Sequence, residues 1–336
     1  MSIRFSAKPM AYTIALIATG GLLSACGGGS SDGPRIQVTP ANAYLLTSNN
    51  RIIGVDLDDT EYARSVIAIG RNAVAPNVTG HSSRLLDISE QIIDIDYRNA
   101  EGKLYALTRI GNEGRIIRID GQLILRLGTL SADPSDNSSP YTGLLSSAKY
   151  TIDFNPTVDK LRIIGNDGTN LRVTITPGAE ADPDITTSPA APTALVTTDG
   201  SINCQPAPCT APSITGAAYT DEGPKTSARS TRLFGLDKLS TYALDANAGA
   251  VTTVRGLGVI GISDVNGYDI NPANNQGVAV FTVDGTPSVY AIDSTLNGTG
   301  SAATRLTNLP TLENETYIGL SLVTGANPTV TTPTAP

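Results

Sequence analysis

Three aspartates recur at one position of a repeated stretch, and their carboxylates are the first candidates for chemistry. They are Asp96 in Asp-Tyr-Arg-Asn, Asp153 in Asp-Phe-Asn-Pro and Asp269 in Asp-Ile-Asn-Pro. Carboxylate oxygens are hard ligands that suit Ca²⁺, so one hypothesis is a shared cation site. The other is structural, because an aspartate at a strand end can accept backbone N–H groups of the following turn. We expect the turn role, with Ca²⁺ as the one candidate cofactor.

Catalysis finds little support in the sequence. His81 is the only histidine, and no Gly-x-Ser-x-Gly motif accompanies it, so a Ser–His–Asp triad is not indicated. Paired carboxylates can cleave glycosides, but 31 acidic residues single out no pair. We therefore assign no catalytic residue and favour a non-catalytic binding or interaction module. The alternative is a secreted carboxylate-dependent hydrolase or lyase.

The first cysteine indicates export and lipidation. Arg4 and Lys8 precede an apolar run over residues 10–23, which is typical of a signal peptide over residues 1–25. The following Leu-Ser-Ala-Cys resembles the lipobox of bacterial lipoproteins, which implies acylation of Cys26 and a lipid anchor in the membrane. An ordinary cleaved signal with a stray cysteine is the competing interpretation. Gly27 after the cysteine favours, by the same resemblance, the outer membrane of the cell envelope.

The other two cysteines, Cys204 and Cys209, lie close together in a proline-rich loop. In an oxidising compartment such a pair is expected to form a disulfide. Its spacing fits neither a zinc knuckle nor a thioredoxin motif. The formal charge of −8 argues against nucleic acid as a partner, since phosphates demand a basic surface. The expected partner is a protein or small molecule that the sequence does not identify.

The aspartates belong to an internal repeat. Asp96 and Asp153 are 57 residues apart, and Asp153 and Asp269 are 116 apart, which is about twice that spacing. A degenerate middle copy fits at residues 214–220. Around each copy the sequence predicts four short strands rich in β-branched residues and tyrosine, separated by Gly, Asn, Asp and Pro turns. No stretch has sustained helical periodicity.

Twenty strands are predicted from this pattern. They span residues 43–48, 51–56, 65–71, 92–98, 103–109, 115–120, 124–130, 150–155, 161–166, 171–175, 193–199, 214–220, 232–237, 239–245, 251–257, 267–271, 277–283, 288–293, 304–309 and 317–323. The first unit lacks its opening strand, and residues 317–323 supply it from the other end of the chain. This closure predicts an all-β fold, a β-propeller of five four-stranded blades. A sixth blade within residues 72–91 and a two-sheet sandwich are the alternatives.

Several of these phrases resemble one known family. Residues 92–108, 151–173, 214–221 and 267–281 are similar to the bacterial Domain of Unknown Function 4394 family. The resemblance covers about residues 43–323 and implies a propeller-like fold, but no activity or site residue. The resulting domain prediction is a signal peptide at 1–25, the lipidated cysteine and tether at 26–40, one propeller at 41–325 and a disordered tail at 326–336.

Overall fold

The computed structural model describes residues 41–72, 82–83, 85–121, 123–136, 139–176, 193–207, 210–221, 230–296 and 298–323. Every regular element within these ranges is a β-strand, so the predicted all-β class is confirmed. The described residues contain no helix that is long and apolar enough to cross a membrane.

The strands pair mainly as antiparallel neighbours in sequence. One sheet has the order β24 (Tyr317–Leu322), β1 (Ala43–Thr47), β2 (Arg51–Asp56) and β3 (Asp59–Ala68). A second run contains β7 (Gln91–Arg98), β8 (Lys103–Ile110), β9 (Glu113–Asp120) and β10 (Leu123–Ala132). A third contains β11 (Tyr150–Phe154), β12 (Leu161–Gly165), β13 (Asn170–Thr176) and β14 (Thr193–Thr198).

Two further sheets complete the fold. One has the order β16 (Gly216–Tyr219), β17 (Leu233–Leu236), β18 (Ser240–Leu244), β19 (Ala250–Gly256) and β15 (Asn203–Cys204). The other has the order β20 (Ile262–Asn271), β21 (Gln276–Val283), β22 (Thr286–Ile292) and β23 (Ala303–Asn308). The predicted strands overlap these elements, although β3 begins six residues and β20 five residues before the expected start, and β3 ends at Ala68 where the prediction ran to residue 71. Two register shifts against β21 accompany the longer β20.

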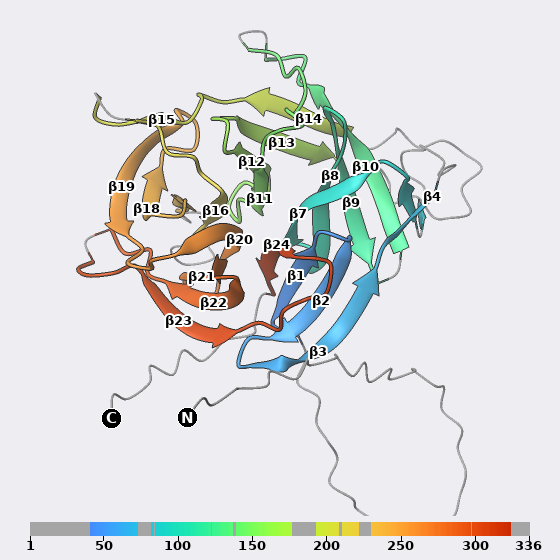
Figure 1. Cartoon of the computed structure of the whole chain (residues 1–336). Coiled ribbons are helices and arrows are strands. Elements are labelled where there is room, and N and C mark those ends of the chain that lie inside the picture. Colours follow the sequence, from blue (N-terminus) through green and yellow to red (C-terminus); the bar gives the residue numbers. More distant parts are fainter. Residues whose placement is uncertain are drawn as a thin grey trace, which may run out of the picture.

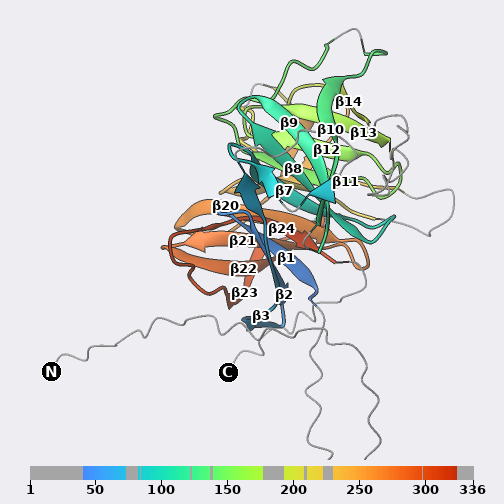
Figure 2. The ribbon, with the colours of Figure 1, turned by 90° about the vertical axis from the view of Figure 1, so that its right-hand side faces the viewer.

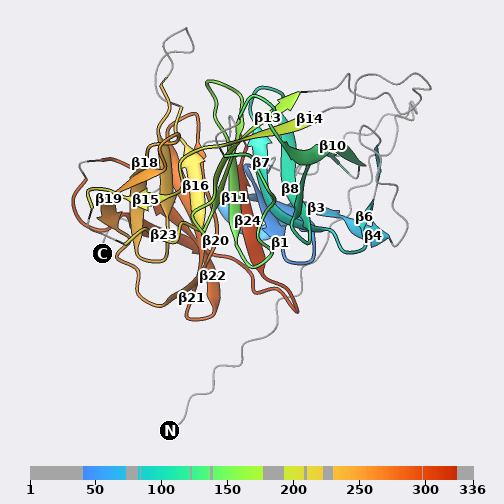
Figure 3. The same ribbon diagram turned by 90° about the horizontal axis from the view of Figure 1, so that it is seen from above.

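The first strand of each antiparallel run lies near the middle of the molecule, and the later strands lie farther out (Figure 1). These inner strands contact one another in the cyclic order β24, β7, β11, β16, β20 and back to β24. Seen from above, β16 and β11 stand side by side in the centre (Figure 3). The C-terminal strand β24 therefore joins β1 on one side and closes the ring between β20 and β7.

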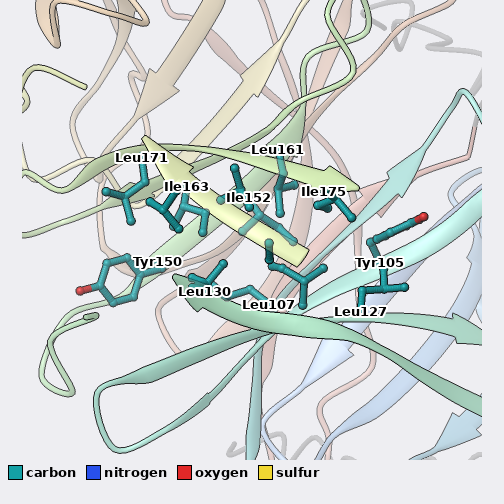
Figure 4. Packing of buried hydrophobic residues seen from close by; sticks show 14 of the residues in the cluster. Tyr105, Leu107, Leu127, Leu130, Tyr150, Ile152, Leu161, Ile163, Leu171 and Ile175 are labelled. Atoms are coloured by element: carbon teal, nitrogen blue, oxygen red, sulfur yellow. The ribbon is translucent and has the colours of Figure 1, made fainter. Parts of the chain in front are cut away.

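Two neighbouring runs are also joined at their outer strands. β10 carries a bulge between Arg126 and Gly128, and bulges bend a strand. Its last residues, Leu130 to Ala132, then pair in parallel with Ala194 to Val196 of β14. Side chains of β8 and β10 pack there against those of β11, β12 and β13 (Figure 4). In the side view, the two joined runs, β7–β10 and β11–β14, lie above β20–β23 and β1–β3 (Figure 2).

Short strands that the sequence did not predict lie between β3 and β7. β4 (Gly70–Asn72) pairs in parallel with β6 (Leu85–Asp87), and β5 (Ser82–Ser83) pairs with β10. The described residues of this segment add no further four-stranded sheet. Cys204 lies in β15, whereas Cys209 lies outside the described residues, so the disulfide stays a prediction. Cys26 and His81 also lie outside them.

Candidate functional site: a cluster of buried carboxyl groups

The structure brings the three repeated aspartates together. Asp96 lies in β7, Asp153 in β11 and Asp269 in β20, which are three of the five inner strands. One carboxylate oxygen from each lies within 4.8 Å of the other two. All three residues are buried, with exposed fractions of 5–7%. Because a repeat places the same residue at the same point of each inner strand, ring closure makes these side chains converge.

Each aspartate links its own strand to the next strand around the ring. Asp96 Oδ2 accepts a hydrogen bond from the Phe154 amide at 2.7 Å. Asp153 Oδ1 accepts one from the Tyr219 amide at 3.0 Å, and Asp269 Oδ2 accepts one from the Leu322 amide at 2.7 Å. These bonds satisfy buried amides on neighbouring inner strands that do not pair with one another in a sheet. The aspartates therefore hold neighbouring inner strands together.

The same position is filled differently in the other two inner strands. In β24 it is Ser321, whose Oγ accepts from the Tyr97 amide at 2.8 Å and donates to Asp96 Oδ1 at 3.2 Å. In β16 it is Ala218, which has no polar side-chain atom. The amide that would face it, that of Ile270, donates to Asp269 Oδ1 at 2.6 Å. The ring therefore contains three carboxyl groups, one hydroxyl group and one methyl group.

The turn role expected of the aspartates is carried out by other residues. Asn155 Oδ1 accepts the amides of Thr157 and Val158 at 2.9 and 3.2 Å. Asn271 Oδ1 accepts the amide of Ala273 at 2.9 Å. These asparagines stand two residues after Asp153 and Asp269, so the motif contains both functions. The aspartate bonds across the ring, and the asparagine caps the turn.

A fourth buried carboxyl group lies beside the cluster. Asp94 Oδ2 accepts the Ile152 amide of the next strand at 2.9 Å. Its Oδ1 lies against Gly319, where an added Cβ would approach it to 2.5 Å. A side chain at residue 319 would therefore displace Asp94. Sequence reasoning missed Asp94 because no other copy of the repeat has an acid at that position.

Burial raises the pKa of every one of these carboxyl groups. It raises the pKa of Asp94 to about 8 and that of Asp96 to about 6, against backbone hydrogen bonds that act in the opposite direction. For Asp153, burial and then repulsion from Asp96 and Asp269 hold the pKa well above its usual range. Burial and then Asp96 do the same for Asp269. The cluster therefore retains protons at a pH where exposed aspartates have lost theirs.

The space beside the cluster is small. The cavity lined by Asp96, Asp153 and Asp269 has a volume of about 10 Å³, enough for about one water molecule or small ion. Ca²⁺ takes six to eight oxygen ligands, whereas this cluster offers three carboxyl groups that already accept backbone amides. Calcium binding stays a prediction. The arrangement is suited to sharing protons between neighbouring carboxyl groups, as closely spaced acids do.

We expect stability to depend on pH through Asp94. Between its ordinary pKa of 3.8 and its raised pKa of about 8, the folded protein keeps a proton that the unfolded chain releases. The contribution of Asp94 is therefore complete below about pH 4 and is lost as the pH rises through about 8. Chemical denaturation of wild type and Asp94→Asn across pH 5–9 should show a wild-type free energy of unfolding that falls more steeply, by up to about 1.4 kcal/mol per pH unit.

The matched control for this experiment is Asp284→Asn, which removes an exposed carboxylate. Its free energy of unfolding should follow the wild-type curve at every pH. Parallel curves for wild type and Asp94→Asn would contradict the assignment of the buried proton to Asp94.

A second, larger cavity lies between two neighbouring sheets. Its volume is about 430 Å³, and its walls come from β12 and β13 on one side and β17 and β18 on the other. Cavities of roughly 300–1,000 Å³ hold small organic molecules. None of the predicted site residues lines this cavity. Its lining residues are far apart in sequence, so no local pattern could have indicated it.

Comparison with known families assigns the chain. A family model described as a domain of unknown function (DUF4394) matches residues 69–319. The chain belongs to this family. The DUF4394 match contains Asp96, Asp153 and Asp269 together with the strands that form the larger cavity. The comparison with curated proteins finds no match.

Solved structures give only remote similarity to this DUF4394 protein. An auxiliary nutrient binding protein from Bacteroides thetaiotaomicron has 14% identity and a TM-score of 0.35, with 70% of this chain and 55% of that chain covered. An exo-β-1,3-galactanase from Phanerochaete chrysosporium has 12% identity and a TM-score of 0.35, with 71% and 52% covered. A Lactobacillus plantarum protein has 14% identity and a TM-score of 0.31, with 84% and 99% covered. Similarity at this level supports no assignment of activity.

Proposed function

We propose that this DUF4394 protein is a five-bladed β-propeller that acts as a non-catalytic binding module on the bacterial cell envelope. The proposal rests on the difference between the central cavity and the larger cavity that lies between two sheets. The central acids, which would be the groups for hydrolysis, bond to backbone amides beside a space of about 10 Å³. The cavity between sheets has about 430 Å³, which suits a small-molecule ligand.

Contacts among the inner strands support the proposal of five blades. Each of β24, β7, β11, β16 and β20 begins one antiparallel run, and together they form a closed ring. The parallel pairing of β10 with β14 then joins two blades at their outer edges. Closure by β24 is the feature that a propeller requires to protect its terminal blade.

The proposed location on the cell envelope rests on Cys26 and the residues before it. An apolar run and a small-residue cleavage site precede the cysteine, and a Gly- and Ser-rich stretch follows it. Several acyl chains on the new amino terminus would give a stable anchor, whereas one chain binds only marginally. The same export would place Cys204 and Cys209 in an oxidising compartment.

We expect Cys26→Ala to abolish incorporation of labelled palmitate and to move the protein from the membrane fraction to the soluble fraction. The measurement is metabolic labelling and fractionation of cells that express the full chain. Cys204→Ala should leave the label unchanged and serves as the control. Palmitate incorporation by Cys26→Ala would overturn the anchor.

A carboxylate-dependent hydrolase or lyase is the second candidate, because three acids with raised pKa values converge in one place. The central cavity, however, has no room for an organic substrate. The test is a broad panel of hydrolase and lyase substrates with the purified mature protein. We expect no turnover above background. Turnover that is lost in both Asp96→Asn and Asp153→Asn would reject the binding proposal.

A further inference from the structure

The cavity between β12–β13 and β17–β18 is rich in cationic side chains. Its lining includes Lys160, Arg162, Arg172 and Arg232, and Asp245 is the one acidic residue among the described lining residues. The chain as a whole has a formal charge of −8. A concave surface lined by one sign of charge raises the local concentration of ligands of the opposite sign.

The described carboxylates near Arg162 and Arg172 do not cancel the positive charge of these two residues. Asp245 lies in a turn, where its Oδ1 accepts the amides of Asn247 and Ala248 at 3.0 Å each. Asp199 pairs with two guanidinium groups, Arg162 at 2.6 Å and Arg172 at 3.3 Å. One carboxylate shared by two arginines leaves one positive charge uncompensated at this point of the wall.

Arg162 is held firmly in the wall. Its side chain is 4% exposed. Its Nε donates to the Tyr219 hydroxyl at 3.0 Å, and its Nη1 donates to Asn170 Oδ1 at 2.9 Å and to Asp199. Its Nη2 makes no hydrogen bond with the part of the chain that the structure describes. A guanidinium fixed in this way is preorganised to receive an oxyanion.

Arg172 also has unused hydrogen-bonding capacity. Its Nε is buried without a partner among the described residues, and its one contact with Asn247 is long, at 3.5 Å. Buried donors are normally satisfied, so an orphaned one beside a cavity needs an explanation. The Nε itself is covered by protein, but the Arg172 side chain as a whole is 30% exposed, so the rest of its guanidinium is accessible to an acceptor group in the cavity.

Part of the remaining wall is apolar. Val158 and Leu296 line it with exposed side chains, whereas the Leu161 side chain is 0% exposed and packs in the core with side chains of β8 and β10. An apolar wall with a few fixed polar groups is the usual composition of a small-molecule site. The cavity therefore favours a molecule that has an apolar body and an anionic end.

We propose that this cavity binds a small organic anion, with a carboxylate or phosphate group at Arg162 and Arg172 and an apolar body against Val158 and Leu296. The proposal rests on the binding function proposed above and names the chemical class of its ligand. It requires no catalytic step.

The experiment is isothermal titration calorimetry of the purified mature protein with four probes, namely benzoate, phenyl phosphate, inorganic phosphate and benzyl alcohol. We expect saturable binding of benzoate or phenyl phosphate that weakens with added salt, and weaker binding of benzyl alcohol. If benzoate binds more tightly than phenyl phosphate, the anionic group of the ligand is a carboxylate. If phenyl phosphate binds more tightly, it is a phosphate. Inorganic phosphate tests the contribution of the apolar body.

Arg172→Gln should weaken binding of the preferred anion at least about tenfold, and Lys160→Gln gives a second variant on the rim if the first fails to fold. Lys149→Gln, an exposed lysine on another surface that pairs with Asp264, removes the same charge and should leave affinity unchanged. Failure of every anion to bind, equal binding of benzyl alcohol, or unchanged affinity in the pocket variants would overturn the proposal. These outcomes would reject the anionic ligand only. The binding function itself is rejected by a different result, namely substrate turnover in the enzyme panel.

Discussion

Replacing Glu90 with alanine is expected to destabilise the protein by about 3–5 kcal/mol, because it leaves a buried guanidinium without its carboxylate. Glu90 is 0% exposed and lies between β6 and β7. Its carboxylate accepts from Arg126 Nη1 at 2.9 and 3.2 Å and from Thr108 Oγ1 at 2.6 Å. The measurement is the free energy of unfolding from urea denaturation at one pH.

Two further variants make this result specific. Glu313→Ala removes an exposed carboxylate and should change stability by less than about 0.5 kcal/mol. The double variant Glu90→Leu with Arg126→Met replaces both charges with apolar groups and should recover much of the loss, since removing the pair costs less than breaking it. Equal stability of Glu90→Ala and Glu313→Ala would contradict the ion pair.

The second large effect is expected at Asp153, where two uncharged variants should differ. Asp153→Asn keeps an oxygen that can accept the Tyr219 amide, whereas Asp153→Ala leaves that buried amide unsatisfied. An unsatisfied buried donor costs about 1–3 kcal/mol. We therefore expect Asp153→Ala to be less stable than Asp153→Asn by about that amount, measured by chemical denaturation.

This comparison separates the hydrogen bond from the charge. Both variants remove the same ionisable group, so the energetic cost of burying a carboxylate is absent from their difference. Asn155→Ala, which removes the turn cap, is the matched comparison for a turn role. If Asp153→Asn proves as unstable as Asp153→Ala, the link from β11 to β16 through this side chain is wrong.

The sequence predicted the strands well because strand formation depends on local pattern. Alternating β-branched residues and intervening Gly, Asn, Asp and Pro residues occur within a few positions of one another. The repeat spacing also placed the degenerate copy correctly, since residues 214–220 contain β16. The C-terminal strand was paired correctly with β1 because a closed array needs a strand at that edge.

The partners of the aspartates could not be predicted in the same way. Asp96 bonds to Phe154 and Asp153 to Tyr219, which lie 58 and 66 residues farther along the chain. Local sequence pattern indicates only the turn that follows each aspartate, and after Asp153 and Asp269 that turn is capped by the asparagine two residues later. The repeat did contain a signal, since equivalent positions on a closed ring must face one another.

The sequence by itself determined the all-β class, the approximate positions of the main strands and the equivalence of Asp96, Asp153 and Asp269, because each follows from short-range pattern and from a repeat. Only the tertiary structure decided that these carboxyl groups meet in a buried cluster with raised pKa values. It also decided the place of the cationic cavity, because Arg162 lies in β12 whereas Arg232 directly precedes β17 of another sheet. Burial and proximity depend on how sheets pack, and packing brings together residues that the linear order separates.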